Sequence, residues 1–219
     1  AITRFPLTTV FLLAAAAVNA VDISTESTDY SKYLLTLVVG AFLGAVSQVV
    51  YERFFIKSST RILLIGVAAL LALGYFLIIM PAPELSMEIG IRTSVALLAL
   101  LFAFILIPAV KSEISFNESF MVAFKAFFIA LFFSGVIFAG TSIIIAAINQ
   151  LLFSVDHRAY PHTANVVFLL YAPVYFLSLI PVYPGKKIVK DQEAADKQTE
   201  NINKMAGCPK FLEILISFI

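Results

Sequence analysis

Apolar residues in this chain are gathered into six long runs, which are separated by shorter polar connections. A helix needs roughly 17–25 residues to cross a bilayer core about 30 Å thick, and each run is of that length. One such run is typical of a buried helix in a soluble protein, but six in succession are typical of a membrane protein. The pattern therefore predicts a single all-α domain, a polytopic transmembrane helical bundle. The six predicted spans are residues 5–21, 33–50, 62–80, 93–110, 126–149 and 165–182.

A seventh apolar run, residues 211–219, closes the sequence. This run is too short to cross the bilayer, so we expect a truncated seventh span and a chain that is a fragment of a longer protein. The first run has a second interpretation, because Arg4, the apolar stretch and the small residues around Ala20 resemble a secretory signal peptide. We favour a first span, since five further spans follow, and cleavage would leave the topology of the rest unchanged.

The composition supports a membrane protein. Hydrophobic residues make up 61% of the 219 residues and charged residues only 13%, with a mean hydropathy of +0.97, whereas soluble domains carry about 25% charged residues. A soluble fold this apolar would expose large adhesive patches, so the lipid bilayer is the partner that fits. The net charge is only +1, which gives no indication of a nucleic-acid partner. The lone cysteine, Cys208, excludes an intrachain disulfide.

The distribution of Lys and Arg predicts the orientation of the bundle. Alternate connections lie on opposite sides of the membrane, and only Lys32, Arg92 and Arg158 fall on one side, while the other 12 of the 15 basic residues fall on the opposite side. Basic residues are enriched in cytoplasmic loops. We therefore expect a cytoplasmic N-terminus in a bacterial cytoplasmic (inner) membrane. The charged segment 184–210 is then a cytoplasmic loop within the domain, helical or irregular.

The fifth span has a recognisable start. Ser115 and Glu118 have the spacing of a capping box, in which each side chain satisfies a free amide at a helix N-terminus. A helix from there to Asn149 is about 51 Å long at 1.5 Å per residue, which is more than the hydrocarbon core. Two interpretations stay open. Either residues 116–125 lie in the inner membrane interface with Lys125 reaching water, or the whole helix is a long tilted span.

The spans lack the residues on which most membrane chemistry depends. None of the six predicted spans contains Asp, Glu, Lys, Arg or His, although such groups usually mark ion pathways and proton relays. The sequence also lacks the Gly-x-Ser-x-Gly, His-Glu-x-x-His and phosphate-loop motifs. These absences argue against a proton-coupled transporter and against an enzyme. We predict no catalytic residue and no cofactor.

The densest polar cluster on the side predicted to face out of the cell contains Asp156 and His157, followed by Tyr160 and His162. An aspartate and two histidines can ligate zinc. Their spacing matches no common ligand pattern, however, and Pro161 breaks any helix between the two histidines. We therefore favour a solvated loop and predict no metal site.

Two groups of small residues are candidates for helix packing. Gly40 and Gly44 form a Gly-x-x-x-Gly pattern in the second span, and Gly135 and Gly140 belong to a similar small-residue face in the fifth. Small residues at this spacing allow another helix to approach closely, within the chain, in a homo-oligomer or in a membrane-protein partner. The alternative is chance occurrence in helices that are rich in small residues. Neither interpretation is catalytic.

Pro173 is the only proline well inside a predicted span. It lacks an amide hydrogen and its ring collides with the carbonyl of Leu169, so it predicts a kink. Tyr171 and Tyr175 flank it, and the three residues are candidates for a kink or a ligand pocket. The freed carbonyl needs a hydrogen-bond donor in hydrocarbon. We expect a protein hydroxyl, which favours a packing role, whereas water in a polar, solvent-accessible cavity that touches Leu169 favours transport.

Three segments resemble a known family: residues 4–8 (RFPLT), 116–128 (FNESFMVAFKAFF) and 171–185 (YAPVYFLSLIPVYPG). They are similar to segments of the bacterial membrane family called domain of unknown function 4153. The resemblance covers most of the chain, and it implies that this chain is the N-terminal membrane part of a longer bacterial protein. The family has no assigned activity, so the resemblance implies no cofactor and no functional residue.

Two functions from different classes follow from these patterns. The first is a permease-like bundle for an uncharged or lipidic solute, suggested by the six spans and the residues around Pro173. The second is a membrane scaffold or sensor protein acting through partner proteins, suggested by the uncharged spans, the small-residue faces and the charged loop. A membrane enzyme ranks last, because the sequence contains no catalytic constellation.

Overall fold

The computed structural model of this chain describes residues 1–25, 30–81, 86–112, 114–184 and 192–207. Within these residues every regular element is a helix, and six helical segments are long and apolar enough to cross a membrane. The predicted all-α bundle with six spans is confirmed. The predicted seventh span and Cys208 lie outside the described residues. The elements are α1 (Pro6–Ser24), α2 (Ser31–Phe54), α3 (Ser58–Ile79), α4 (Met87–Leu106), η1 (Ile107–Ala109), α5 (Phe116–Leu151), α6 (Ala159–Ala164), η2 (Asn165–Tyr171), α7 (Ala172–Leu179) and α8 (Gln192–Ala206).

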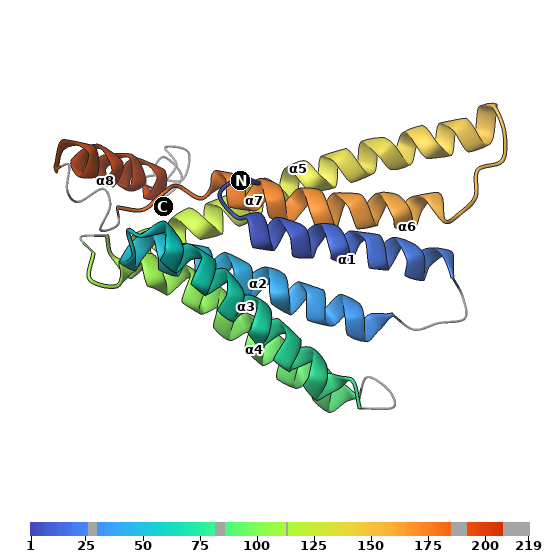
Figure 1. Cartoon of the computed structure of the whole chain (residues 1–219). Helices are drawn as coiled ribbons and strands as arrows, with labels where there is room; N and C mark the ends of the chain where they lie inside the picture. The colour runs from blue at the N-terminus through green and yellow to red at the C-terminus, as the bar shows by residue number, and fades with distance from the viewer. Residues whose placement is uncertain (26–29, 82–85, 113, 185–191, 208–219) are drawn as a thin grey trace.

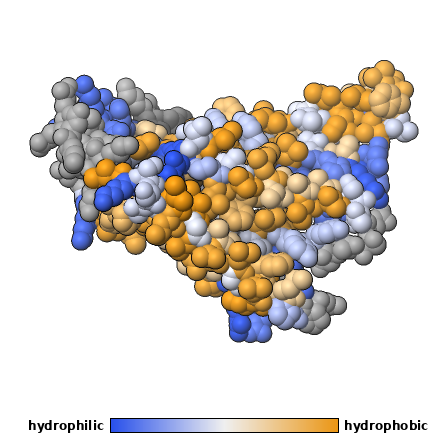
Figure 2. Space-filling model, viewed as in Figure 1, coloured by the Kyte–Doolittle hydropathy of each residue, from blue (hydrophilic) through white to orange (hydrophobic). Residues whose placement is uncertain are grey.

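The helices converge at one end of the molecule and diverge toward the other (Figure 1). The N-terminus, the start of α5 and the end of α7 meet at the convergent end, which we call the basic end because Arg4, Arg53 and Arg61 lie there. Toward the opposite end, the α3–α4 hairpin and α5 separate. Figure 2 shows hydrophobic residues over most of the visible face of the long helices, which is the surface expected in lipid.

The main cluster of buried apolar side chains lies at the basic end. It draws side chains from α2, α4, α5, α7 and α8 and from the segments that flank them. Phe5, Ile114 and Ile202 are among its fully buried members. Lipid is as apolar as these side chains, so close packing and hydrogen bonds, rather than removal from water, hold helices together in a membrane. This chain provides close packing and hydrogen bonds together at the basic end.

The helices are longer than the apolar runs that predicted them. The second helix continues four residues past Val50 to Phe54, and α4 begins at Met87, six residues before the predicted start at Thr93. The predicted boundaries are wrong at these ends, because hydropathy marks the hydrocarbon core whereas helices continue into the polar interface. Ionisable side chains therefore do lie on the spanning helices, close to their ends.

Helix α5 begins with the predicted capping box and continues unbroken for 36 residues. The Ser115 hydroxyl oxygen accepts from the Glu118 amide at 3.2 Å, and the Glu118 carboxylate accepts from the Ser115 amide at 2.6 Å. At 1.5 Å per residue the helix is about 54 Å long, which exceeds a bilayer core as predicted. Ring contacts with centroids 4.7–6.2 Å apart follow its first turns, through Phe116, Phe120, Phe124 and Phe128.

Part of the charged segment after α7 folds into α8, which packs on α5. Ile202 is fully buried in this contact. The Lys125 ammonium of α5 donates to the carbonyls of Met205 and Ala206 at 2.9 and 3.1 Å, and also to that of Gly207. A cation at a helix C-terminus satisfies free carbonyls and interacts favourably with the helix dipole. Lys125 therefore anchors α8 instead of extending freely into water.

Gly40 and Gly44 lie where α2 meets α1. A Cβ added at Gly40 would lie 2.8 Å from a ring carbon of Phe11, and one at Gly44 would lie 3.0 Å from the backbone nitrogen of Thr8. The Thr8 hydroxyl also donates to the carbonyl of Ala41 at 3.1 Å. Contacts this close require a residue without a side chain, so the two glycines allow α1 and α2 to approach closely.

Gly135 and Gly140 have no such neighbour. Within the described residues, no atom of another helix lies within 4 Å of a Cβ placed at either position. The adjacent Ser134 is fully buried, so α5 packs on the bundle through a different face. Packing of Gly135 and Gly140 against another helix therefore stays a prediction, and it concerns contacts with other molecules or with residues beyond those described.

Leucine at Gly44 should lower the stability of the protein in detergent, because its Cβ meets backbone, which cannot rotate away. We expect the free energy of unfolding to fall by about 1–3 kcal/mol, measured from the denaturation midpoint of the purified protein. Gly66→Leu is a matched control that enters open space on α3, and it should change this free energy by less than about 0.5 kcal/mol. An unchanged midpoint in Gly44→Leu would contradict the close approach of α1 and α2.

Candidate functional site

A half-open cavity of about 250 Å³ lies between α1, α2, α4 and the continuous segment of η2 and α7. It adjoins the basic end, because Ala45, Phe104 and Leu177 line the cavity and also belong to the buried cluster there. Spaces between the helices of a bundle are common ligand sites. The cavity is lined by Thr8, Leu12, Val38, Ala41, Phe42, Ala45, Leu101, Phe104, Leu169, Pro173, Phe176 and Leu177.

The wall of this cavity is apolar. Thr8 is the only lining residue with a polar side chain, and its hydroxyl already donates to the carbonyl of Ala41. Among the described residues that form the wall, none presents a polar atom to the cavity. A cavity without hydrogen-bonding partners does not hold ordered water. The site therefore suits an apolar group and is unsuited to an ion or a proton relay.

Small side chains on α2 create the space. Ala41 and Ala45 lie one helical turn apart and both line the cavity. The opposite walls carry the larger Phe104 and Phe176, whose ring centroids are 6.1 Å apart. Side chains four residues apart project from the same helix face, so a larger residue at either alanine would fill the cavity.

The proline and tyrosine candidates separate into two places. Pro173 lines the cavity together with Leu169. The rings of Tyr171 and Tyr175 stack on each other with centroids 5.5 Å apart, and Phe133 of α5 meets Tyr175 edge-on at 5.8 Å. Tyr175 thus packs against α5, and neither tyrosine lines the cavity. Of the three residues, only Pro173 contributes to the pocket.

The backbone before Pro173 is π-helical. At the end of η2 the Ala172 amide donates to the carbonyl of Val167, which lies five residues earlier instead of four. Proline collides with the carbonyl four residues before it, and local π-helical turns are one way in which membrane helices accommodate proline. The irregularity predicted from Pro173 therefore takes the form of a wider turn.

The predicted donor to the freed carbonyl of Leu169 differs from what we find. The hydroxyls of Thr141 and Ser178 donate within their own helices, to the carbonyls of Ile137 and Tyr175 at 2.8 and 2.6 Å. The apolar cavity touches Leu169 instead. This cavity is apolar and is not the water-filled cavity that we expected of a transport path, so a packing role for this position stays a prediction.

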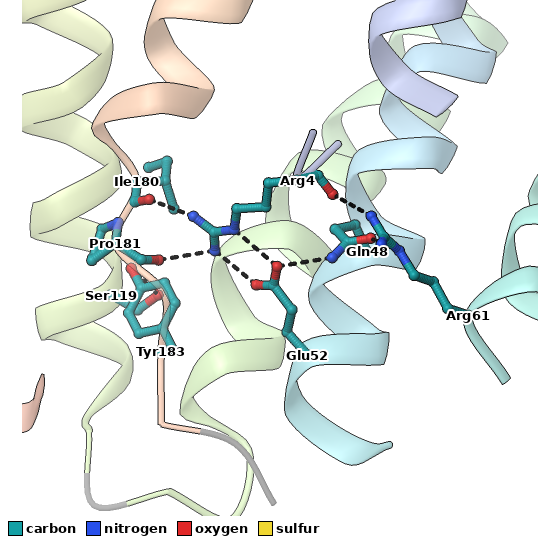
Figure 3. A network of polar contacts seen from close by, with 8 residues as sticks. All are labelled: Arg4, Gln48, Glu52, Arg61, Ser119, Ile180, Pro181 and Tyr183. Carbon is teal, nitrogen blue, oxygen red and sulfur yellow. Dashed lines mark hydrogen bonds and ion pairs between the residues drawn. The ribbon is translucent and has the colours of Figure 1, made fainter. Parts of the chain in front are cut away.

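A largely buried ion pair closes the basic end of the bundle (Figure 3). The Arg4 guanidinium donates twice to the Glu52 carboxylate, at 2.9 Å from Nε and 2.7 Å from Nη2. Its remaining donors reach the carbonyls of Ile180 and Pro181 at 2.6 and 3.0 Å. Both charged side chains are only 17% exposed. Through these charge-assisted bonds Arg4 joins the start of α1, the end of α2 and the segment after α7.

Gln48 and Arg61 extend this network to α3. The Gln48 amide donates to Glu52 at 2.9 Å and accepts from Nε of Arg61 at 3.2 Å. Nη2 of Arg61 also donates to the carbonyls of Thr3 and Arg4 at 3.2 and 3.1 Å. The single carboxylate of Glu52 is thus held by one guanidinium directly and by a second through an amide (Figure 3).

Arg53 forms a second clamp beside the first. Its guanidinium donates to the carbonyl of Val110 at 2.9 Å and to the carbonyls of Lys111 and Pro184. Lys111 has a φ of 52°, in the left-handed region that disfavours residues with a side chain by about 1 kcal/mol. Arg53 holds this turn in place and ties the α4–α5 connection to the end of α2.

Tyr183 and Ser119 add a buried neutral contact at the same end. The Ser119 hydroxyl donates to the carbonyl of Ile105 at 2.7 Å and lies 3.5 Å from the Tyr183 hydroxyl. Burial raises the pKa of Tyr183, although the contact with Ser119 acts in the opposite direction. The phenol therefore stays protonated at neutral pH. The basic end is closed by the Arg4–Glu52 ion pair, by bonds from Arg53 and Arg61 to neutral acceptors, and by this neutral contact.

The polar cluster at the opposite end links helix ends. The Asp156 carboxylate accepts from the Arg158 amide at 2.9 Å, which lowers the pKa of that carboxyl, and His157 lies 3.2 Å away. Nε2 of His162 lies 3.4 Å from the Ser24 hydroxyl of α1. In the part of the chain that the structure describes, no three His, Cys, Asp or Glu side chains lie together as metal ligands.

Sequence reasoning counted Arg4 and Glu52 only as charges at span ends and did not bring them together. The sequence contained one indication of this polar site, because Glu52 and Arg53 are adjacent charged residues at the end of an uncharged span. The partners of Arg4, however, are 48, 176 and 177 residues away in the chain. Contacts of this range follow from tertiary packing and not from any local pattern.

Comparison of this chain with protein-family models, with curated proteins and with solved structures gives no match.

Removal of one partner of the Arg4–Glu52 pair should destabilise the protein, because the other charge stays largely buried. We expect Glu52→Ala to lower the free energy of unfolding in detergent by about 3 kcal/mol, at the lower end of the range for buried pairs. The matched control is Glu88→Ala, which removes an exposed pair between Glu88 and Arg92 and should lower the free energy by less than about 1 kcal/mol.

The charge-swapped double variant Arg4→Glu/Glu52→Arg sharpens this test. It restores opposite charges but places a carboxylate against the carbonyls of Ile180 and Pro181, which need a donor. We therefore expect no recovery of stability. Full recovery would show that charge attraction alone, and not the carbonyl contacts, holds the basic end closed.

Proposed function

We propose that this chain, an integral multi-pass membrane protein, is a permease-like bundle for an uncharged or lipidic solute. The observation that carries the proposal is the apolar cavity, which lies between spanning helices and reaches Leu169 beside Pro173. An ion or a strongly polar solute would lose its hydration there without gaining hydrogen bonds. An apolar uncharged solute or a lipid chain meets no such penalty.

The different arrangement of the two ends supports a gated path. At the basic end the bonds of Arg4 and Arg53 join four segments of the chain, whereas at the other end the α3–α4 hairpin and α5 diverge (Figure 1). Passage of a solute requires the closed end to open, and transporters open by rocking one group of helices against another. The bonds between Arg4, Glu52 and Ile180 are those that such a motion breaks.

A membrane scaffold or sensor protein that acts through partner proteins is the second candidate. The observation that favours it is the face of α5 around Gly135 and Gly140, which no described helix covers. A homo-oligomer or another membrane protein would then pack on this face. The cavity has no role in that function, so variants that fill the cavity distinguish the two candidates.

We also propose the family, membrane and orientation that the sequence suggests. Membership of the bacterial family called domain of unknown function 4153 rests on the resemblance of the three segments alone. A bacterial cytoplasmic membrane with the N-terminus inside is supported by the excess of basic residues on one side of the spans. Lys111 lies with Arg53 at the same end of the bundle as Arg4, as this orientation requires.

Cysteine labelling of intact cells tests the orientation. In a Cys208→Ser background, a membrane-impermeant maleimide should label Lys32→Cys and should label Lys57→Cys only after the cells are permeabilised. The reason is that Lys32 lies at the start of α2 and Lys57 lies just after its end, so the two positions are on opposite sides of one spanning helix. Labelling of Lys57→Cys in intact cells, with protection of Lys32→Cys, would reverse the proposed orientation.

Vesicles of phosphatidylethanolamine and phosphatidylglycerol that contain the purified protein test the function. One assay follows movement of a fluorescently labelled phosphatidylglycerol between leaflets, by dithionite quenching, and another follows movement of a labelled phosphatidylcholine in the same way. We expect at least one rate to exceed that of protein-free vesicles. We further expect Ala45→Leu, which fills the cavity, to lower this rate by about fivefold or more.

The matched control for cavity filling is Ala99→Leu, which adds the same atoms at an exposed position of α4 and should keep the rate within about twofold. Rates equal to those of protein-free vesicles in both assays would contradict the permease proposal. An increased rate that Ala45→Leu leaves unchanged would show that the cavity is not the path.

A further inference from the structure

We infer that the cavity binds one hydrocarbon chain of a membrane lipid, and that it recognises the chain without recognising the head group. This inference deepens the proposed function by naming the chemical class of the solute. It uses three properties of the cavity: its polarity, its direction in the bundle and its volume.

The polarity of the wall excludes every part of a lipid except its chain. The Thr8 hydroxyl is committed to the carbonyl of Ala41 at 3.1 Å, and no polar atom of the described wall is left to bind a ligand. A hydroxyl, amide or ester placed there would lose hydrogen bonds to water and find none in exchange. The rings of Phe42, Phe104 and Phe176 offer apolar contact only.

The wall of the cavity follows two helices in the direction in which lipid chains lie. It follows α2 from Val38 to Ala45 and the η2–α7 segment from Leu169 to Leu177. Seven or eight residues of helix correspond to about 10–12 Å at 1.5 Å per residue. Spanning helices and lipid chains both run across the bilayer, so a chain can enter between helices without turning.

The volume matches part of one chain. The cavity measures about 250 Å³, which is room for roughly eight groups of the size of a water molecule or a methylene. An empty space of this size between apolar side chains is unfavourable, because the atoms around it lose their contacts. The surrounding bilayer supplies hydrocarbon chains at high concentration, and these fill the space without loss of hydration.

The head group must stay outside the cavity. The cations Arg4 and Arg61 of the basic end already donate to Glu52, to Gln48 and to backbone carbonyls. A phosphate would have to displace these bonds to reach either guanidinium. Binding should therefore depend on the chain and should be insensitive to the charge of the head group.

Photolabelling of the full chain in lipid nanodiscs tests the inference. The probe is a phosphatidylglycerol with a diazirine in the middle of one acyl chain, and labelled residues are located by mass spectrometry. We expect labels on Phe42, Phe176 or other residues of the wall. Ala41→Leu should reduce these labels by about fivefold or more, because its side chain occupies the cavity.

A control variant, a second lipid probe and a replacement variant complete the experiment. Ala99→Leu, at an exposed position of α4, should leave the labels on the wall within about twofold. A phosphatidylcholine probe with the same chain should label equally well. Ala45→Leu fills the cavity from the next turn, and it replaces Ala41→Leu if that variant does not fold by circular dichroism and size-exclusion chromatography.

Labels that are confined to lipid-facing residues, or that neither alanine variant reduces, would overturn the inference, and so would a strong preference for one head group. The proposed function is tested separately by the vesicle rates. Labels on the wall of a protein that does not accelerate transport would support the chain site and contradict the permease proposal. Accelerated transport without labels on the wall would support the permease proposal and contradict the chain site.

Discussion

The bidentate bond between Arg4 and Glu52 is the contact on which the closed end of the bundle depends. Apolar helices in lipid gain little from burying one another, so polar bonds and close contacts decide which helices stay together. Arg4 brings three separate segments to one guanidinium, with all its bonds between 2.6 and 3.0 Å. Arg53 repeats this arrangement for the α4–α5 connection.

The cavity exists because the basic end is held together from several directions at once. Arg4 fixes where α1 and the end of α7 lie relative to α2, and the glycines of α2 allow α1 to approach. The alanines of the same helix are then too small to fill the remaining space beside Pro173. The proposed permease function depends on this apolar cavity next to a polar closure.

The long α5 connects this closed end to a part of the molecule with few internal contacts. Its first half carries the capping box, Lys125 and side chains of the buried cluster, so it belongs to the basic end. Its second half exposes large apolar side chains such as Val136, Ile143 and Leu151. In a bilayer such a surface is compatible with lipid or with another helix, and the described chain provides no helix that covers it.

The sequence alone determined the number and nature of the spanning helices, because hydropathy and length are local properties that the bilayer selects directly. The capping box at Ser115 is equally local, as is an irregularity at Pro173. The predicted spans contain no Asp, Glu, Lys, Arg or His, and the charged residues of the described spanning helices lie toward their ends.

Only the tertiary structure decided which residues form a site. The sequence treated Gly44 and Gly135 alike, yet one faces α1 and the other faces no described helix, because packing depends on the rotation of each helix in the bundle. It grouped Tyr175 with Pro173, yet the two side chains point to different neighbours. Arg4 meets Glu52 and Ile180 across 48 and 176 residues, and no periodic pattern carries information over such distances.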